Sequence, residues 1–277
     1  MSTTALADRG YQAEAAELEL PVVSNLPVNG EYRHLVLEAG APATLAEAGQ
    51  FFHLLCPASG ADRPFFRRPM STYRADRAAG RIEFLYKVTG AGTRGLATLV
   101  PGDRLNVVGP LGTGFRLDPA WASIVVLGRG VGLATLAPLA ELAASAGVRV
   151  TAILSARSPD LVMSADRFRA AGAEVFPVLD SDGSSDPGRV GKLVSGLVRL
   201  GRADAFFTCG SNRLLALMKR LGREHGIPGQ VALEQQMACG LGMCFCCVRA
   251  FEVEGRHVSR RVCWDGPVFP LEEAVSW

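Results

Sequence analysis

The residues of this chain that could carry chemistry gather near its C-terminal end, where five of the seven cysteines lie. Cys239, Cys244 and Cys247 follow the spacing C-x4-C-x2-C, and Cys263 stands 16 positions further on. This spacing is typical of a [2Fe–2S] cluster, whose irons are held by soft, negatively charged thiolates. The pattern therefore predicts a cluster with these four cysteines as its ligands.

Other uses of the cysteines are less consistent with the pattern. Structural zinc sites usually offer two short-spaced pairs, whereas Cys263 stands alone. Disulfides are disfavoured by the odd cysteine count and by the lack of an export signal. Cys246 falls outside the spacing and is interpreted as a non-ligand, although an exchange with Cys247 stays open. Cys56 and Cys209 lie far from this segment along the chain.

Length, composition and net charge limit the classes of protein to which this chain can belong. A length of 277 residues predicts two domains with room for a small third module, and 48% hydrophobic residues supply real cores. A net charge of +2 predicts no strong attraction to nucleic acid or to an anionic membrane surface. No apolar run is long enough to span a bilayer and no export signal is visible, so the cytoplasm is the expected location.

The first part of the chain has the sequence pattern of a β-protein. Residues 1–17 are expected to form a flexible N-terminus. Residues 18–116 alternate short apolar runs with Gly, Pro, Asn and Asp clusters, which predicts a small antiparallel barrel with one short helix at 93–99. The expected strands span 19–23, 32–38, 51–56, 81–88 and 104–108.

From residue 117 onward the sequence pattern changes to one of alternating strands and helices. In residues 117–229 this alternation predicts a parallel sheet covered on both faces, ahead of a cysteine module in residues 230–277. The predicted fold class is thus multidomain α+β, with a barrel, a parallel α/β domain and a small C-terminal module. The expected strands span 123–128, 148–154, 174–178, 205–209 and, last in the sheet, 231–233, and the expected helices 131–146, 161–171, 190–200 and 213–225.

Two segments of the barrel could bind an anion. Arg68 and Ser71 stand at one strand end, and a guanidinium beside a hydroxyl suits a phosphate or the edge of a flavin ring. Gly92 and Thr93 open the short helix, whose backbone amides suit a pyrophosphate. An ordinary turn is the commoner explanation of either segment, and Tyr86 fits the barrel core as well as a ligand site.

A glycine-rich turn joins the first strand and helix of the α/β domain. Gly128, Gly130 and Gly132 are spaced G-x-G-x-G, which departs from the usual dinucleotide pattern G-x-G-x-x-G. Nucleotide binding and a plain tight turn therefore both remain open. Cys209 and Gly210 end a later strand at the same carboxyl edge, where open α/β sheets bind ligands. Taken alone, Cys209 is more simply a small buried residue.

Taken together, these segments resemble the electron-transfer subunits of two-subunit, NAD-dependent (class 1B) dihydroorotate dehydrogenases, within the ferredoxin–NADP reductase superfamily. The resemblance covers about residues 18–272 and includes segments 68–71, 85–87, 90–93, 101–103, 109–115 and 209–210. It is most specific at residues 237–244 and 261–269, where Cys263 lies within Arg-Val-Cys-Trp-Asp-Gly-Pro-Val-Phe.

The resemblance implies an electron-transfer oxidoreductase in which cofactors, rather than catalytic side chains, carry the redox chemistry. The barrel would bind FAD, the α/β domain would take NAD(P)H, and the [2Fe–2S] cluster would pass single electrons to a flavin in a catalytic, FMN-containing partner subunit of a hetero-oligomer. The implied FAD residues are Arg68, Pro69, Met70, Ser71, Leu85, Tyr86, Lys87, Gly92 and Thr93. The implied NAD(P)H residues are Gly128, Gly130, Gly132, Cys209 and Gly210, and the cluster ligands are Cys239, Cys244, Cys247 and Cys263.

Two residues depart from the family's usual nucleotide loop, Gly-Gly-Gly-x-Gly-x-x-Pro. Arg129 replaces the middle glycine and Thr135 replaces the proline. Arg129 could add a cation near a phosphate or block its approach, so nucleotide binding is the part of the prediction that these residues put in question. NAD and NADP both stay open, because Ser155 and Arg157 suit a 2′-phosphate while no acidic residue there favours a free 2′-hydroxyl.

Two other functions remain as alternatives. One is a stand-alone reductase of a soluble acceptor, and the other is a non-catalytic binding or regulatory module stapled by a four-cysteine zinc site. Electrons can leave only if the cluster lies near the partner. The neighbourhood of Phe245, Trp264 and Phe269 is therefore expected either to face that partner or to shield the cluster from water.

Overall fold

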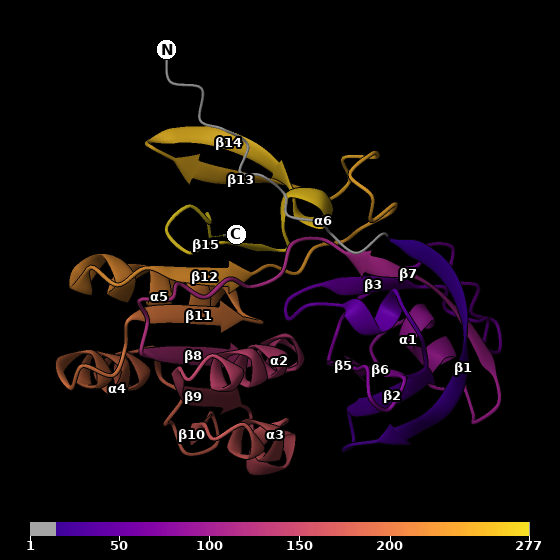
Figure 1. The fold of residues 1–277 in the computed structure, drawn as a ribbon, viewed down its shortest axis with the longest axis horizontal. Helices are drawn as coiled ribbons and strands as arrows, with labels where there is room; N and C mark the ends of the chain where they lie inside the picture. The colour runs from indigo at the N-terminus through magenta and orange to yellow at the C-terminus, as the bar shows by residue number, and fades with distance from the viewer. Residues whose placement is uncertain (1–14, 277) are drawn as a thin grey trace.

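A computed structural model describes residues 15–276, which form three units. Figure 1 shows the barrel on the right, the α/β sheet at lower left, and the C-terminal module in yellow above both. The predicted flexible N-terminus falls mostly outside the described residues. Ala16 and Glu17, which were expected in that segment, begin the first strand instead and pair with Gly109 and Val108.

The N-terminal unit is an antiparallel sheet curled into an open barrel. Its strand order is β4-β3-β7-β1-β2-β6-β5, and every neighbouring pair is antiparallel. The sequence pattern did not reveal β4 and β5, which are only four and three residues long. The elements are β1 (Ala16–Pro27), β2 (Tyr32–Glu38), β3 (Phe51–Leu54), β4 (Arg68–Ser71), β5 (Arg74–Asp76), β6 (Arg81–Lys87), α1 (Ala91–Leu96) and β7 (Arg104–Leu111).

Alternation along the strands separates the barrel core from the face that meets the other units. Phe84 and Tyr86 of β6 are fully buried, as their period-two spacing predicts. In β3, Phe52 and Leu54 enter the same core. Phe51 points the other way and joins an apolar cluster shared with the α/β sheet and the C-terminal module.

The second unit is a parallel sheet with helices on both faces, as predicted. Its strand order is β10-β9-β8-β11-β12-β15. The chain starts in the middle at β8, runs outward to β10, and returns to β11, so the order reverses between β8 and β11. The elements are β8 (Ser123–Arg129), α2 (Gly132–Ser145), β9 (Arg149–Ala156), α3 (Ala165–Ala170), β10 (Glu174–Leu179), α4 (Pro187–Arg199), β11 (Ala205–Cys209), α5 (Asn212–His225) and β12 (Gly229–Ala232).

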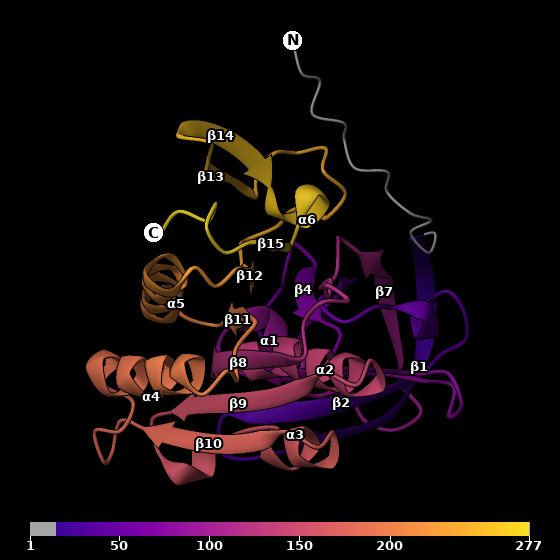
Figure 2. The same ribbon diagram turned by 60° about the vertical axis from the view of Figure 1, so that its left-hand side comes forward.

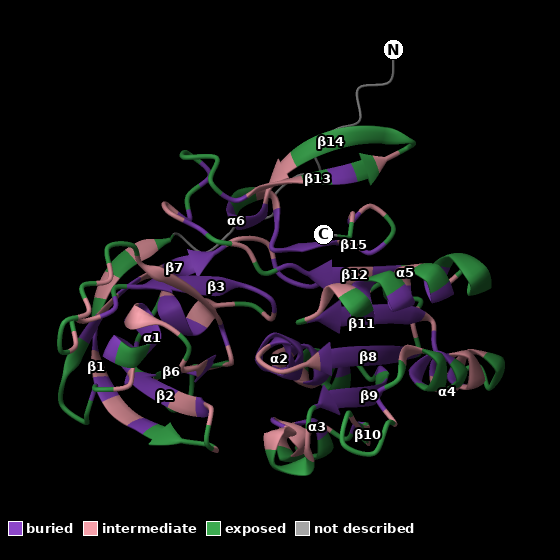
Figure 3. Cartoon of the chain, turned by 180° about the vertical axis from the view of Figure 1, so that it is seen from behind, coloured by how far each residue is buried: buried purple, intermediate pink, exposed green. Residues whose placement is uncertain are grey.

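Strand β8 shows why both faces of this sheet are covered. Ile124 and Val126 pack with α2 and α3, whereas Val125 and Leu127 pack with α4 and α5. A strand buried on both sides reads as a continuous apolar run, which is the sequence pattern of β8. In Figure 3 the central strands β8, β9 and β11 are accordingly buried over most of their length, whereas β14 is largely exposed.

The C-terminal module is tied into this sheet. Strand β15 (Val268–Pro270) pairs antiparallel with β12, so the prediction that residues 231–233 form the last strand of the sheet is wrong. A three-residue strand after the cysteines carries too little pattern to be predicted. Figure 2 shows the hairpin of β13 (Val248–Val253) and β14 (Arg256–Arg261) standing above the sheet, with α6 (Val262–Asp265) next to it.

Helix α3 is shorter than the predicted 161–171. Ser164 adopts a left-handed backbone conformation with φ of 63°, and it separates the 3-10 turn Pro159–Leu161 from the helix. The other predicted helices agree with the structure to within three residues at each end. Among the helices of residues 15–276, none is both long and apolar enough to cross a membrane.

Candidate functional site

The cysteine loop connects β12 to β13 and is shaped by two glycines. Gly240 and Gly242 have φ of 71° and 77°, a region in which a side chain is strained. A Cβ on Gly242 would also lie 2.8 Å from Cγ of Trp264. The backbone N–H groups of Leu241 and Gly242 donate to the sulfurs of Cys239 and Cys263, at 3.3 and 3.2 Å.

The four predicted ligands lie in two neighbouring pairs. The thiol of Cys244 lies close enough to Cys239 to affect its pKa, and the thiol of Cys247 does the same for Cys263. The N–H of Cys263 also donates to the sulfur of Cys247 at 3.4 Å. Cys246 is exposed, and its thiol is directed to the carbonyl of Gln236. The geometry therefore sets Cys246 apart from the other four cysteines of the segment.

The pKa values of Cys239 and Cys263 are shifted in opposite directions. Burial raises the pKa of Cys239, but the N–H groups of Leu241, Cys244 and Met243 outweigh it and bring the pKa to about 7. Burial, together with the neighbouring thiol of Cys247, raises the pKa of Cys263 to about 12. Ionising Cys263 thus requires a positive partner, which cluster iron would supply.

The donor set fits a two-iron cluster. Backbone donors already point at the sulfurs, and [2Fe–2S] clusters are held by four thiolates. Within residues 15–276, no three His, Cys, Asp or Glu side chains gather closely enough to hold a single metal ion. The structure brings Cys239, Cys244 and Cys247 of the loop together with Cys263 of α6.

The barrel brings together the two segments predicted to bind an anion. The side chain of Arg68, on β4, lies across Gly92, because a Cβ on Gly92 would be 2.8 Å from its Nε. The hydroxyl of Thr93 accepts hydrogen bonds from the N–H groups of Thr89 and Gly90, at 2.9 and 3.1 Å. Thr93 thus stabilises the turn that presents Gly92 beside the guanidinium.

The remaining predicted flavin residues divide between the core and the surface. Tyr86 is fully buried, and its hydroxyl donates to Oδ1 of Asn25 at 2.9 Å, so its side chain belongs to the barrel core. Met70 packs against the same core. Leu85 faces the α/β unit instead, and the ammonium of Lys87 pairs with Glu31 at 2.7 Å. Pro69 is half-buried opposite His53 in the β3–β4 ladder.

The glycine-rich turn after β8 packs against the end of β11. A Cβ on Gly132 would lie 2.6 Å from the carbonyl carbon of Cys209. Gly210 has φ of 96°, and its Cβ would lie 2.2 Å from the carbonyl oxygen of Arg129. Gly130, with φ of 56°, makes the turn itself. A Cβ on Gly128 would overlap Leu136 of α2 at 2.6 Å. The two strand ends thus meet where the strand order reverses, which is where open α/β sheets bind ligands.

The side chain of Arg129 points away from the turn and does not fill the space beside it. Its guanidinium donates to the hydroxyl of Ser155 at 2.8 Å and to the carboxylate of Asp180, with one contact at 3.1 Å. It therefore ties the turn to the ends of β9 and β10. Hydrogen bonds from Arg129 and Ser185 lower the pKa of Asp180 to about 2. Arg157, the other basic residue predicted near this edge, pairs with Glu31.

A hydroxyl bridge joins the α/β unit to the barrel. The hydroxyl of Thr135 on α2 donates to the hydroxyl of Ser71 at 2.8 Å. The Thr135 hydroxyl also lies next to the buried thiol of Cys209. Glu234 follows β12 and acts electrostatically on Cys209. This carboxylate is accessible to solvent yet closely surrounded by protein, and the resulting desolvation raises its pKa.

Sequence reasoning missed Glu234, although one signal was available. It is an acidic residue immediately after a predicted parallel strand, at the edge where ligands bind. The role of Thr135 as a bridge was not visible in the sequence, because nothing in the pattern placed Ser71, at the end of a four-residue strand, beside α2.

The aromatic residues near the cysteines do not form one surface. Phe245 and Trp264 are 63% and 41% exposed, whereas Phe269 is buried against Phe251 with ring centroids 4.4 Å apart. Phe269 is therefore removed from the predicted partner-facing group. Met243, at 78% exposed, extends the exposed group in its place.

Comparisons with known proteins agree with this arrangement. A family model described as the iron-sulfur cluster binding domain of dihydroorotate dehydrogenase B matches residues 234–275. The chain is 35% identical over 260 residues to the dihydroorotate dehydrogenase B (NAD(+)), electron transfer subunit of Geobacillus thermodenitrificans, covering 92% of this chain and 97% of that protein. The protein of the same name from Desulforamulus reducens is 33% identical over 241 residues, covering 86% of this chain and 91% of that protein.

Solved structures agree as well. The NADH-dependent reduced ferredoxin-NADP oxidoreductase superposes with a TM-score of 0.79 at 27% identity, covering 96% of this chain and 91% of that chain. The ferredoxin reductase of carbazole 1,9a-dioxygenase, at 21% identity and a TM-score of 0.62, covers 77% of this chain and 66% of that chain. This second similarity shows the fold alone.

Proposed function

Because the chain belongs to the family of electron-transfer subunits of dihydroorotate dehydrogenase B, we propose that it passes electrons from NADH, through FAD and a [2Fe–2S] cluster, to a catalytic flavoprotein partner in the cytoplasm. We place the FAD-binding barrel at residues 18–116, the nucleotide domain at 117–229 and the cluster module at 230–277. FAD supplies the step between two-electron hydride chemistry and one-electron transfer when it is bound.

The barrel residues hold and orient the flavin. The guanidinium of Arg68 lies beside Gly92, and together they would bind the pyrophosphate through a guanidinium and a backbone N–H. Ser71 presents its hydroxyl at the end of β4, and Pro69 lies on the same face of that strand. Tyr86 contributes through the core of the barrel, because its side chain is fully buried.

The α/β unit would bring the nicotinamide to the flavin. The turn at Gly130 leaves backbone room for a pyrophosphate, since Arg129 is directed toward Ser155 and Asp180. Ser71, Thr135, Cys209 and Glu234 surround the place where the two units meet. We assign the nicotinamide to this place, with the hydroxyl bridge fixing the distance between the units.

The observation that carries the proposal is the position of the paired cysteines relative to the flavin strand. Strand β3 pairs with the flavin strand β4, and a Cβ on Gly240 of the cysteine loop would lie 2.9 Å from the ring of His53 on β3. One strand therefore separates the proposed flavin site from the proposed cluster site. A short separation of this kind is what transfer between two cofactors requires.

The decisive experiment is an anaerobic visible spectrum with flavin, iron and sulfide analysis, before and after NADH. We expect FAD, two irons and two sulfides per chain, and bleaching by NADH. The matched variants are Cys247→Ser, which should lose the cluster while keeping the flavin, and Cys246→Ser, which should keep both. A colourless protein containing zinc would overturn the proposal, and a cluster lost in Cys246→Ser but kept in Cys247→Ser would reverse the ligand assignment.

A further inference from the structure

His53 is a buried imidazole that the fold leaves without a partner. Its side chain has no accessible surface, and neither Nδ1 nor Nε2 has a hydrogen-bond partner among residues 15–276. Burial, and then the nearby charge of Arg67, lower the pKa of His53 to about 4, so the ring is neutral at physiological pH. A neutral imidazole keeps one N–H donor and one acceptor. Buried polar groups in folded proteins are nearly always satisfied, so this exception calls for a missing partner.

The surroundings of the ring show where that partner belongs. A Cβ on Gly240 would lie 2.9 Å from Cε1, 3.0 Å from Nε2 and 3.1 Å from Nδ1 of His53. Because these three distances are nearly equal, Gly240 lies over the face of the ring beside both nitrogens, and the imidazole packs against the cysteine loop. Gly240 directly follows Cys239, one of the predicted ligands. Only glycine fits here, because any side chain would occupy the space next to the imidazole.

The strand that carries His53 also places it beside the flavin site. His53 pairs with Pro69 and Phe51 pairs with Ser71 in the β3–β4 ladder. Directly paired residues project from the same face of a sheet, so His53 shares a face with two residues proposed to line the flavin. The ring therefore projects from the sheet face that also carries Pro69 and Ser71, and it contacts the cysteine loop.

We propose that His53 is a positioning residue for electron transfer, whose imidazole N–H donates a hydrogen bond to the sulfur shell of the bound [2Fe–2S] cluster. Hydrogen bonds to cluster sulfurs are among the factors that set its reduction potential. Reduction adds negative charge to the sulfurs, so a donor stabilises the reduced form and raises the potential. His53 would in this way favour transfer of an electron from the flavin to the cluster. This inference rests on the proposed function, because it requires the cluster to be present.

The first test is spectroscopic and uses the full-length protein with its cofactors. In protein labelled with ¹⁵N-histidine, electron–nuclear double resonance on the reduced cluster should detect a weak histidine coupling. The coupling should vanish in His53→Phe, which keeps a ring of similar size without nitrogens, and persist in His257→Phe, where an exposed histidine is replaced. A wild-type cluster without histidine coupling would overturn the inference.

The second test measures potentials by dye-mediated titration. In His53→Phe, the equilibrium constant for moving one electron from flavin to cluster should fall about tenfold, equivalent to 59 mV for a one-electron couple. His53→Gln, which restores an N–H donor, should recover part of the shift. An unchanged cluster potential, or a shift confined to the flavin, would refute the inference.

Failure of the proposed function and failure of the role of His53 give different results. If His53→Phe does not assemble a cluster, the wild-type coupling and the His53→Gln potential decide the question. A wild-type protein that takes up no iron would overturn the proposed function and this inference with it. A normal cluster that shows neither histidine coupling nor a potential shift would refute only the role of His53.

Discussion

Arg129 shows how one side chain can keep a binding turn open although it replaces a glycine. Its guanidinium spans to Ser155 and to Asp180, so the bulk lies over the ends of β9 and β10. The sequence alone posed a choice between a useful cation and a steric block. The choice could not be made there, because it depends on where β10 ends and on which way a long side chain turns.

The pairing with Arg129 gives Asp180 a testable pH dependence. Hydrogen bonds from Arg129 and Ser185 lower the pKa of this carboxyl from 3.8 to about 2. A carboxyl with a lower pKa in the folded state stabilises the fold above its unfolded pKa, and this contribution disappears as the pH falls toward the folded value. The urea midpoint of the wild type should therefore exceed that of Asp180→Asn by a constant amount from pH 7 to about pH 5.

The gap between the two midpoints should then narrow as the pH falls from about 4 toward 2. Asp182→Asn serves as the comparison, because hydrogen bonds from Ser184 are the largest cause of the lowered pKa of that neighbouring carboxyl, and the charge of Arg189 is the smallest. A gap between wild type and Asp180→Asn that stays constant down to pH 2 would show that the pair does not form.

The bridge between Thr135 and Ser71 should matter for the rate at which NADH reduces the flavin. Thr135→Val keeps the shape of the side chain but removes the 2.8 Å hydrogen bond. The loss of one such bond is worth about 1 kcal/mol, which corresponds to a roughly fivefold slower step if the bond is formed in the transition state. Anaerobic stopped-flow reduction measures this rate directly. Thr135→Ser, which retains the hydroxyl, should react like the wild type, and equal rates in the valine variant would rule out the bridge.

At the level of elements, the close approach of two strand ends is the feature most sensitive to substitution. Gly210→Ala combines a φ of 96° with a Cβ 2.2 Å from a backbone oxygen. We expect it to lower the free energy of unfolding by about 3 kcal/mol or more and to weaken NADH binding. Chemical denaturation and NADH titration measure the two effects.

Gly172→Ala is the matched control for the effect of backbone conformation alone. Gly172 has φ of 78°, and a Cβ at this position would meet no atom within 4 Å. Only the left-handed conformation should therefore cost free energy, about 1–2 kcal/mol. Equal destabilisation by the two alanine variants would mean that the packing of the two turns contributes nothing.

The predictability of the elements follows their length and periodicity. Strand β2 was predicted at its observed bounds, and the buried alternation of β6 was read from the sequence, because seven residues carry a clear pattern. Strands β4, β5 and β15 are three or four residues long and were missed, and so were the six-residue strands β13 and β14, whose polar sequences show no apolar alternation. Their formation depends on partners that the rest of the fold supplies. The cysteine spacing was read directly, since ligand identity is local, whereas the contact of His53 with Gly240 joins positions 187 residues apart.

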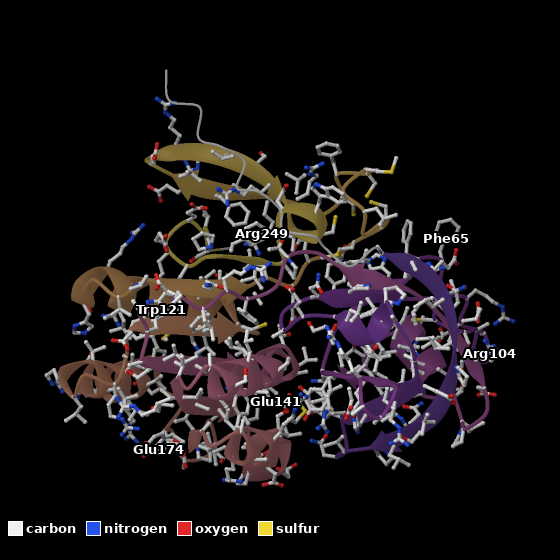
Figure 4. The ribbon with its side chains drawn as sticks, in the orientation of Figure 1. Phe65, Arg104, Trp121, Glu141, Glu174 and Arg249 are labelled. Atoms are coloured by element: carbon white, nitrogen blue, oxygen red, sulfur yellow. The ribbon has the colours of Figure 1, made fainter. Side chains whose placement is uncertain are left out.

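At the level of the whole molecule, the three units place the two ends of an electron path on different surfaces. The proposed nicotinamide site lies where α2 meets β4, whereas the cysteine loop projects at the top of the molecule in Figure 1. Figure 4 labels Phe65, which projects from the edge of the barrel on the side of that loop and is 87% exposed. Exposed apolar side chains therefore gather on the side from which electrons would leave.

This arrangement predicts where the catalytic partner docks. Met243 and Phe245 are 78% and 63% exposed beside the predicted ligands, and apolar anchors of this kind carry much of the energy of protein interfaces. The double variant Met243→Ser with Phe245→Ser should weaken association with the partner by about thirtyfold or more, on the basis of about 1 kcal/mol per residue. Surface plasmon resonance with the immobilised partner measures the affinity.

The control for this docking surface must be equally apolar and equally exposed. Leu200 follows α4 on the far side of the α/β unit and is 71% exposed, so Leu200→Ser should leave the affinity unchanged. Reduction of the flavin by NADH should be the same in all three proteins, because none of these side chains lies at the hydroxyl bridge between Thr135 and Ser71. If the double variant binds the partner as tightly as Leu200→Ser does, the partner must approach from another face, and electrons would have to leave the cluster by a path that does not pass these residues.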